Sequence, residues 1–416
     1  MPLNLQIADL KSGMRLARPL IAGHKLVLPQ GKVLTSADVD ALLKRHPNLH
    51  AYVCDPLLDE AVAFEDDSQT RAVSDIARRR FVQTVQQAQS KFTAGTSLRG
   101  MDFRAIESAI AEIVSFLQEN PIAWAVVGGE EAGSNEVSEH AGNAFYLSMV
   151  LGNAVRGCMA NSERRPQYHF GQPTSRRVLE LAPLGLAALL MDIALWPDYA
   201  SLCHPGPLSP EERERVFRHP AVGAEMLPEA TCSATVEAVR AHHENHDGAG
   251  YPEGLKGDDI PLLARILRIA DAYSAATSER PYRQAKSSVS AFWEMTRGPY
   301  AELYDPVILK LFQAVVQPYP IGAVVQLACG RHAVVVRHGR RHGLLPEIVI
   351  AYDENNRPLP RKHLTGPYRL DEHAEHRILS FRGEDLSFIY GGDPVELDSD
   401  PLLPSQFATL AESEYP

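Results

Sequence analysis

A single carboxylate interrupts an otherwise apolar stretch near the middle of this 416-residue chain. Residues 184–196 read LGLAALLMDIALW, and every position except Asp192 is apolar or glycine. An ionised carboxylate inside an apolar core destabilises the fold by several kcal/mol unless another group compensates its charge. We therefore expect Asp192 to face a compensating partner from elsewhere in the fold.

The composition describes a globular chain of more than one domain, with 45% hydrophobic and 22% charged residues. We expect no membrane span, because no run approaches roughly 18 to 20 uninterrupted apolar residues. The first residues lack the order of a secretory signal, and the five scattered cysteines form no CxxC motif, which together indicate a reducing cytoplasm. The net charge of −11 argues against binding to a nucleic-acid polymer. A small anionic ligand remains compatible, because a few arginines can hold a phosphate locally.

Hydrophobic periodicity and turn residues divide the chain into segments of different character. In the first segment, Thr35 or Ser36 should cap a helix that ends near residue 46. A polar insert at 161–177 should form an exposed loop within the helical region. The segments are an α+β N-terminal module (1–60), a helical linker region (61–132), a helical domain (133–317), a β-rich unit (318–395) and an acidic tail (396–416). The expected fold class is therefore multidomain α+β, with an all-helical core between a small α+β module and a small β-rich unit.

Histidines and carboxylates gather on the apolar helix faces of the helical domain. Glu136 and His140 lie four residues apart, so they share one helix face. His219 should lie at the end of a helix, because Pro220 follows it. The residues of this kind are Glu136, His140, Asp192, His219, His242, His243 and Asp271.

Two interpretations of these residues follow from their spacing. A single histidine on an apolar face is usually a hydrogen-bonded core residue, and the adjacent His242 and His243 could be polar residues at a helix end. Several imidazoles together with carboxylates instead suit Mn, Fe, Zn or Ni, and bridging carboxylates suit two ions. A metal ion would also compensate the charge of Asp192.

Residues 242–283 carry a long motif, HHENHDGAGYPEGLKGDDIPLLARILRIADAYSAATSERPYR. This motif resembles the signature of the HD-GYP family, the branch of the HD metal-dependent phosphohydrolase superfamily that hydrolyses cyclic di-GMP. RHPAVGAEML at 218–227 is similar to a second segment of that family. The resemblance covers roughly residues 133–315, and the N-terminal module resembles the domain that often precedes HD-GYP units.

The resemblance implies an all-helical catalytic core with a di- or trinuclear centre, commonly of iron or manganese. Asp192 would then be the catalytic residue that bridges the metal ions. Tyr251 and Asp247 would lie near the substrate in the GYP loop, and Arg280 would contact its phosphate. The implied metal ligands are His140, Asp192, His219, His242, His243 and Asp271, with Glu136 as the extra carboxylate of trinuclear members.

The chain departs from the family pattern at the segment that gives the HD name. Met191 stands where the family has a histidine, and a neutral thioether is a poor ligand for hard or borderline divalent ions. Leu195 stands where the family has a lysine beside the substrate phosphate, and Ser274 replaces a common aspartate. These replacements predict a metal occupancy reduced to one ion or none, because a ligand is missing from the site.

The sequence thus leaves three functions open. The first is a degenerate HD-GYP protein of bacterial second-messenger signalling, which binds cyclic di-GMP or a signalling protein partner and hydrolyses little. The second is an active metal-dependent cyclic di-GMP phosphodiesterase with a rearranged or reduced centre that recruits a histidine such as His246 or His169. The third is hydrolysis of another, related phosphodiester or phosphoester.

Overall fold

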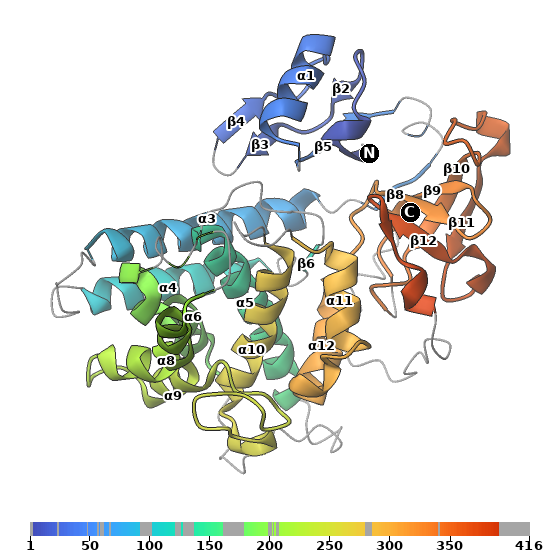
Figure 1. Cartoon of the computed structure of the whole chain (residues 1–416). Helices are drawn as coiled ribbons and strands as arrows, with labels where there is room; N and C mark the ends of the chain where they lie inside the picture. The colour runs from blue at the N-terminus through green and yellow to red at the C-terminus, as the bar shows by residue number, and fades with distance from the viewer. Residues whose placement is uncertain are drawn as a thin grey trace.

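The computed structural model in Figure 1 shows a helical domain, a small N-terminal module and a β-rich unit. The structure describes residues 3–22, 25–47, 49–55, 58, 62–65, 68–91, 102–120, 126–127, 137–160, 179–198, 202, 204, 208–278, 285–339 and 342–390. Glu136, His169, Arg280, the insert at 161–177 and the tail at 396–416 lie outside these residues. Within the described ranges, none of the helices combines the length and apolar character that crossing a bilayer requires.

The N-terminal module is a small antiparallel sheet with one helix. Its three-stranded sheet has the order β1-β5-β2, and β3 pairs with β4 in a separate hairpin. Helix α1 begins after Thr35, whose side chain and that of Asp38 form a reciprocal capping box, so the predicted start of this helix is confirmed. The bounds are β1 (Leu3–Gln6), β2 (Arg15–Leu16), β3 (Leu20–Ala22), β4 (Lys25–Leu28), α1 (Ser36–Arg45) and β5 (His50–Cys54).

The helical domain is built around α5, which packs against α3, α6, α10 and α12. Apolar residues at helical spacing on α4 are buried against this core. A six-residue 3-10 helix, η5 (Ile193–Asp198), directly follows Asp192. The helices are α3 (Ser68–Lys91), α4 (Phe103–Glu119), α5 (Val137–Ala160), α6 (Leu181–Leu190), α8 (Pro210–Met226), α9 (Ser233–Ala241), α10 (Leu262–Thr277), α11 (Ser288–Thr296) and α12 (Pro306–Val315).

The β-rich unit is a six-stranded sheet in the order β11-β10-β9-β8-β12-β13. All of its neighbouring strands are antiparallel, and the turn between β8 and β9 contains Gly330 in a left-handed conformation. The strands are β8 (Val324–Leu327), β9 (His332–Arg337), β10 (Glu347–Tyr352), β11 (Thr365–Arg369), β12 (Ile378–Phe381) and β13 (Glu384–Asp385). Two short strands, β6 (Val126–Val127) and β7 (Val316–Gln317), pair in parallel beside α12.

The central strands of this sheet are covered on both faces. On β9, Val334 joins the core of the N-terminal module, whereas its neighbour Val335 joins the core of the helical domain. On β10, Ile350 and Ala351 divide in the same way. All residues of β10 are therefore buried, as expected for a strand covered on two sides. The beginning and the end of the described chain thus share one hydrophobic core, and the expected multidomain α+β fold is confirmed.

Candidate metal centre

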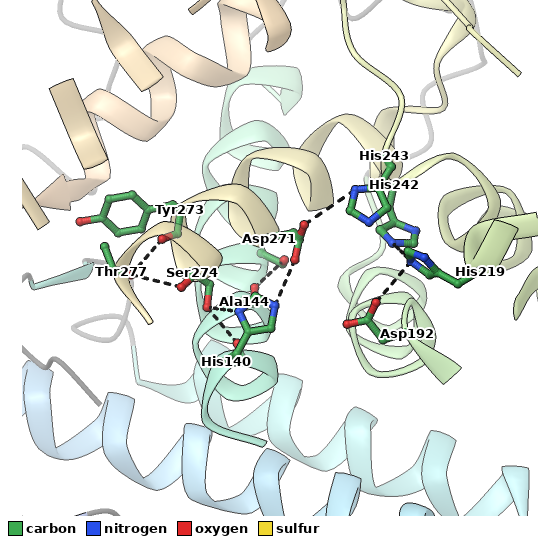
Figure 2. A network of polar contacts seen from close by, with 11 residues as sticks. His140, Ala144, Asp192, His219, His242, His243, Asp271, Tyr273, Ser274 and Thr277 are labelled. Carbon is green, nitrogen blue, oxygen red and sulfur yellow. Dashed lines mark hydrogen bonds and ion pairs between the residues drawn. The ribbon is translucent and has the colours of Figure 1, made fainter. Parts of the chain in front are cut away.

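Six of the predicted metal-ligand residues lie together at the centre of the helical domain (Figure 2). They come from five segments of the chain, each of which contributes one or two of them. His140 lies in the first turns of α5, Asp192 between α6 and η5, His219 in α8, His242 and His243 at the end of α9, and Asp271 in α10. Glu136 lies outside the described residues.

The side chains form two chains of polar contacts. On one side, His219 Nε2 lies 3.4 Å from Asp192 Oδ1 and 3.1 Å from His242 Nε2. On the other side, Asp271 Oδ1 lies 3.1 Å from His140 Nε2, and its second oxygen lies 4.0 Å from His243 Nδ1. One ring nitrogen from each of His219, His242 and His243 fits within a common span of 4.8 Å, which joins the two sides. Asp192 therefore has the partner that its place in an apolar run requires.

Helix α8 differs from the prediction at His219. The helix does not end there but continues through Pro220 to Met226. Proline has no N–H, so it leaves the carbonyl of Val216, four residues back, without its usual helical donor. The Nδ1 of His219 contacts this same carbonyl. The predicted helix end was wrong because one missing hydrogen bond inside α8 is replaced by a side-chain bond that orients the histidine.

The ring of His242 is held in the same manner. Its Nδ1 lies 2.7 Å from the carbonyl of Val239, near the end of α9, where the last carbonyls have no partner within the helix. A carbonyl only accepts hydrogen bonds, so Nδ1 of His219 and of His242 must each carry a proton. In the neutral rings, Nε2 is then a lone-pair nitrogen, which is the form of imidazole that binds a metal ion.

The contact between these two Nε2 atoms requires a cation. Two lone-pair nitrogens 3.1 Å apart repel each other unless a proton or a metal ion lies between them. Burial lowers the pKa of His242 well below its ordinary value, and the neighbouring rings of His243 and His219 lower it further. Protonation of this buried ring at neutral pH is thereby opposed, so the donor set of His219, His242 and Asp192 fits a divalent metal ion.

The electrostatics of the second side follow from burial and close partners. Burial lowers the pKa of His243 to about 3, although the carboxylate of Asp271 opposes the shift. Burial would raise the pKa of Asp271, but the neighbouring imidazoles, that of His140 most of all, outweigh it and hold this pKa below its usual range. The carboxylate is therefore ionised and the imidazole of His243 neutral near pH 7, which are the states that ligate metals.

The GYP loop covers this centre with aromatic side chains. The Tyr251 ring stacks on His243 with centroids 4.8 Å apart, and the half-exposed Phe217 contacts Tyr251 at 4.7 Å. Burial raises the pKa of the Tyr251 phenol, so it stays protonated. Asp247, also in this loop, accepts a bond from the N–H of Ala249 at 2.9 Å and is exposed. The structure thus places Tyr251 against the metal centre and Asp247 at the surface of the loop.

Sequence reasoning missed Glu244, the residue that holds this loop. Its buried carboxylate accepts the N–H groups of Glu253, Gly254 and Leu255 at 2.7, 3.1 and 3.0 Å. Gly250 is also required there, because a Cβ atom would lie 2.2 Å from the backbone nitrogen of Asn245. A charged residue directly after two histidines was the available signal, but the motif alone does not distinguish a loop anchor from a ligand.

Met191 lies in the hydrophobic core beside the centre, with 2% of its surface exposed. It is the C-cap residue directly after α6, and its backbone N–H donates to the carbonyl of Ala187 at 2.8 Å. Leu195 follows in η5 and is half-buried. Neither side chain offers a nitrogen or oxygen ligand. Among residues 191–195, the carboxylate of Asp192 is therefore the one side-chain group that can bind a metal ion.

The cluster of imidazoles and carboxylates forms a candidate metal centre within a helical domain, and comparison with known proteins identifies similar domains. A family model described as HD domain matches residues 173–308. A cyclic di-GMP phosphodiesterase of Pseudomonas aeruginosa is 37% identical over 183 residues, which cover 43% of this chain and 44% of the relative. A cyclic di-GMP phosphodiesterase response regulator of Xanthomonas campestris is 39% identical, covering 30% of this chain and 34% of the relative.

A third relative, a 3'3'-cGAMP-specific phosphodiesterase of Vibrio cholerae, is 43% identical over 24% of this chain and 22% of its own length. The chain therefore spans less than half the length of these relatives. The residues matched by the family model include the long GYP motif at 242–283. Within residues 173–308, the chain is therefore similar to HD domains, and parts of it are similar to the cyclic-dinucleotide phosphodiesterases named above.

Proposed function

We propose that the chain is an HD-GYP protein that binds a metal ion and a cyclic dinucleotide, with cyclic di-GMP as the first candidate, and hydrolyses it slowly or not at all. The observation that carries the proposal is the 3.1 Å contact between the Nε2 atoms of His219 and His242. Because both rings direct their protonated nitrogens at backbone carbonyls, this contact calls for a cation. The phosphodiester then provides the anionic ligand for that cation.

The ligand set is compatible with iron or manganese, the ions that the family resemblance implies. Imidazole and carboxylate together suit these borderline ions, whereas thiolate ligands are absent from the described cluster. His219, His242 and Asp192 would hold one ion, and His140, His243 and Asp271 supply donors beside it. When bound, the ion would polarise the phosphate and lower the pKa of a coordinated water.

The surface around the centre supports a nucleotide ligand. Tyr251 and Phe217 present aromatic rings, on which a base can stack. Arg268 adds positive charge near His243 and Tyr251. Burial lowers the pKa of His243 and raises that of Tyr251, and the charge of Arg268 adds to the first shift and opposes the second. Arg268 is itself held by a 2.9 Å hydrogen bond from its Nε to Asn245. The names of the relatives, which act on cyclic di-GMP or 3'3'-cGAMP, support this class of ligand.

The core position of Met191 supports impaired hydrolysis. The two-metal mechanism needs a full set of donors around both ions, and the thioether replaces one imidazole. Leu195 also removes a cation from the place where charge develops, a type of loss often worth about 3 kcal/mol in the transition state. A ligand-binding signalling role, including contact with a protein partner, needs neither of these groups.

A second function, active hydrolysis by a reduced centre, is favoured by the gathering of six donor side chains. His246 is near enough in sequence to be recruited, but its backbone N–H and carbonyl are bonded to Leu303 and Gly257 in the loop. The side-chain Nδ1 of His246 is buried without a hydrogen-bond partner among the described residues. A shift of this ring toward the centre would require the loop to rearrange.

The test compares wild-type protein with Met191→His in metal content and cyclic di-GMP turnover. We expect the wild type to bind cyclic di-GMP in a metal-dependent manner with little turnover, and Met191→His, alone or with Leu195→Lys, to gain hydrolysis. Met226→His is the matched control, because it makes the same replacement at the end of α8, outside the donor cluster. Rapid wild-type turnover with two bound metal ions would refute the impaired site in favour of the active enzyme.

A further inference from the structure

The hydroxyl of Ser274 contacts His140 at two atoms, one in the backbone and one in the imidazole ring. Its hydroxyl oxygen lies 2.9 Å from the backbone carbonyl of His140 and 2.9 Å from Nδ1 of the same residue (Figure 2). Both residues are buried, with 2% and 5% of their surface exposed. The contact joins α10 to α5, which are direct packing partners in the helical domain.

The direction of each hydrogen bond follows from the number of protons available. A serine hydroxyl has one proton, and a carbonyl only accepts, so the hydroxyl donates to the carbonyl of His140. The Nδ1–H of His140 must then donate to the hydroxyl oxygen. Every contact is satisfied in this arrangement if a cation lies between Nε2 of His140 and Oδ1 of Asp271, which are 3.1 Å apart.

The other two anchored histidines explain why His140 needs a side chain for this purpose. His219 uses the carbonyl of Val216, which Pro220 leaves without a donor, and His242 uses the carbonyl of Val239 at a helix end. His140 lies inside the continuous helix α5, where the carbonyls accept from N–H groups four residues ahead. An acceptor for its Nδ1 therefore has to come from another helix.

We propose that Ser274 is a positioning residue that fixes the Nδ1-protonated form of His140 and so turns Nε2 toward the metal. This inference rests on the proposed function, because it assigns a role at the same centre. Ser274 does for His140 what backbone carbonyls do for His219 and His242. Among these three described histidines, His140 is then the one whose orientation a single side-chain replacement can release.

The variant Ser274→Ala removes the acceptor and keeps the rest of the packing. A partner that orients a metal-ligating histidine commonly contributes about 10- to 100-fold to metal affinity. We expect Ser274→Ala to weaken Mn²⁺ binding to the full-length chain by that factor, measured by calorimetric titration of metal-free protein. Ser274→Thr keeps a hydroxyl and should restore most of the affinity.

Ser148→Ala is the matched control, because Ser148 is equally buried on α5 and donates only to the carbonyl of Ala144, at 2.7 Å. Its Mn²⁺ affinity should equal that of the wild type. The second measurement is the ¹⁵N spectrum of histidine-labelled protein loaded with Zn²⁺, in which His140 should show a protonated Nδ1 and a metal-bound Nε2. This signature should change in Ser274→Ala. If Ser274 had only a packing role, its removal would leave the signature unchanged.

Three outcomes would count against the inference. Equal Mn²⁺ affinities of Ser274→Ala and the wild type would overturn the positioning role and leave the proposed function standing. A loss of Mn²⁺ affinity in Ser148→Ala as large as that in Ser274→Ala would have the same consequence. A wild-type protein that binds no Mn²⁺ would overturn both together. If Ser274→Ala does not fold, Ser274→Cys decides, because sulfur keeps the size but accepts weakly and should also lose affinity relative to Ser274→Thr.

Discussion

Replacing Glu244 by glutamine should loosen the loop that carries Tyr251 without removing any donor of the metal centre. The carboxylate of Glu244 accepts three backbone N–H groups, two on Oε1 and one on Oε2. Glutamine has one acceptor oxygen, and its amide group only donates. One of the three N–H groups, that of Leu255 if the oxygen keeps its two bonds, would then face another donor.

The size of the effect follows from this hydrogen-bond geometry. A hydrogen bond to a charged group contributes about 1.5 to 3 kcal/mol, and the two remaining bonds weaken when the acceptor is neutral. The buried position of Glu244 prevents water from replacing the lost acceptor. We therefore expect Glu244→Gln to lower the stability of the loop by about 2 to 4 kcal/mol.

Hydrogen exchange measures this local stability directly at the amides of Glu253, Gly254 and Leu255. Exchange at these amides should accelerate in Glu244→Gln, and cyclic di-GMP affinity should fall because Tyr251 is no longer held on His243. Mn²⁺ affinity should change much less. Glu253→Gln is the control, because it removes an exposed carboxylate from the same loop. Unchanged exchange in Glu244→Gln would refute the anchoring role.

Two further predictions concern pH and metal removal. Burial, assisted by the charge of Arg297, lowers the pKa of His342 from 6.5 to about 4, so its neutral form stabilises the fold above pH 6.5 and this contribution is lost as the pH falls toward 4. Between pH 7 and 5, this group should lower the unfolding free energy of the wild type by about 2 kcal/mol. Urea unfolding should show a smaller loss over the same pH range in His342→Gln. The exposed-site control His363→Gln should behave like the wild type. A chelator should lower the melting temperature of the Mn²⁺-loaded wild type, because a metal at about 100 times its Kd stabilises by about 2.7 kcal/mol. The chelator should leave the melting temperature of His242→Asn unchanged. An equal drop in melting temperature in that variant would exclude His242 as a ligand.

Local patterns predicted the parts of this fold that depend on neighbouring residues. The helix cap at Thr35 was predictable because its side-chain acceptor and the N–H group that it binds lie only three residues apart. The end of α8 was not, because Pro220 usually marks a helix boundary and only the fold shows that His219 takes over the free carbonyl.

The shared core of the N-terminal module and the β-rich unit is not visible in local patterns either. Asn4 pairs with Ala323, and its N–H donates to the carbonyl of Gly322 at 2.9 Å, although more than 300 residues separate these positions in the chain. The burial of both faces of β10 results from this association. A strand with one face exposed and a strand with both faces covered differ in their environment, which a short alternating segment does not specify.

The anchors of this site would keep its shape under the proposed replacement of a ligand by Met191. Two of the anchored histidines depend on backbone carbonyls, and the GYP loop depends on the carboxylate of Glu244, so none of these supports involves the position of Met191. A methionine at this position packs into the hydrophobic core beside α6 and stabilises the fold by its burial. A histidine there would need a metal ion or a buried hydrogen-bond partner to offset the cost of burying its polar nitrogens. Under the proposed function, binding of one ion and a phosphodiester would therefore be separable from hydrolysis in this fold. The proposed loss of catalysis at Met191 would not require loss of the remaining donors, since their geometry is maintained by hydrogen bonds that also stabilise the helices.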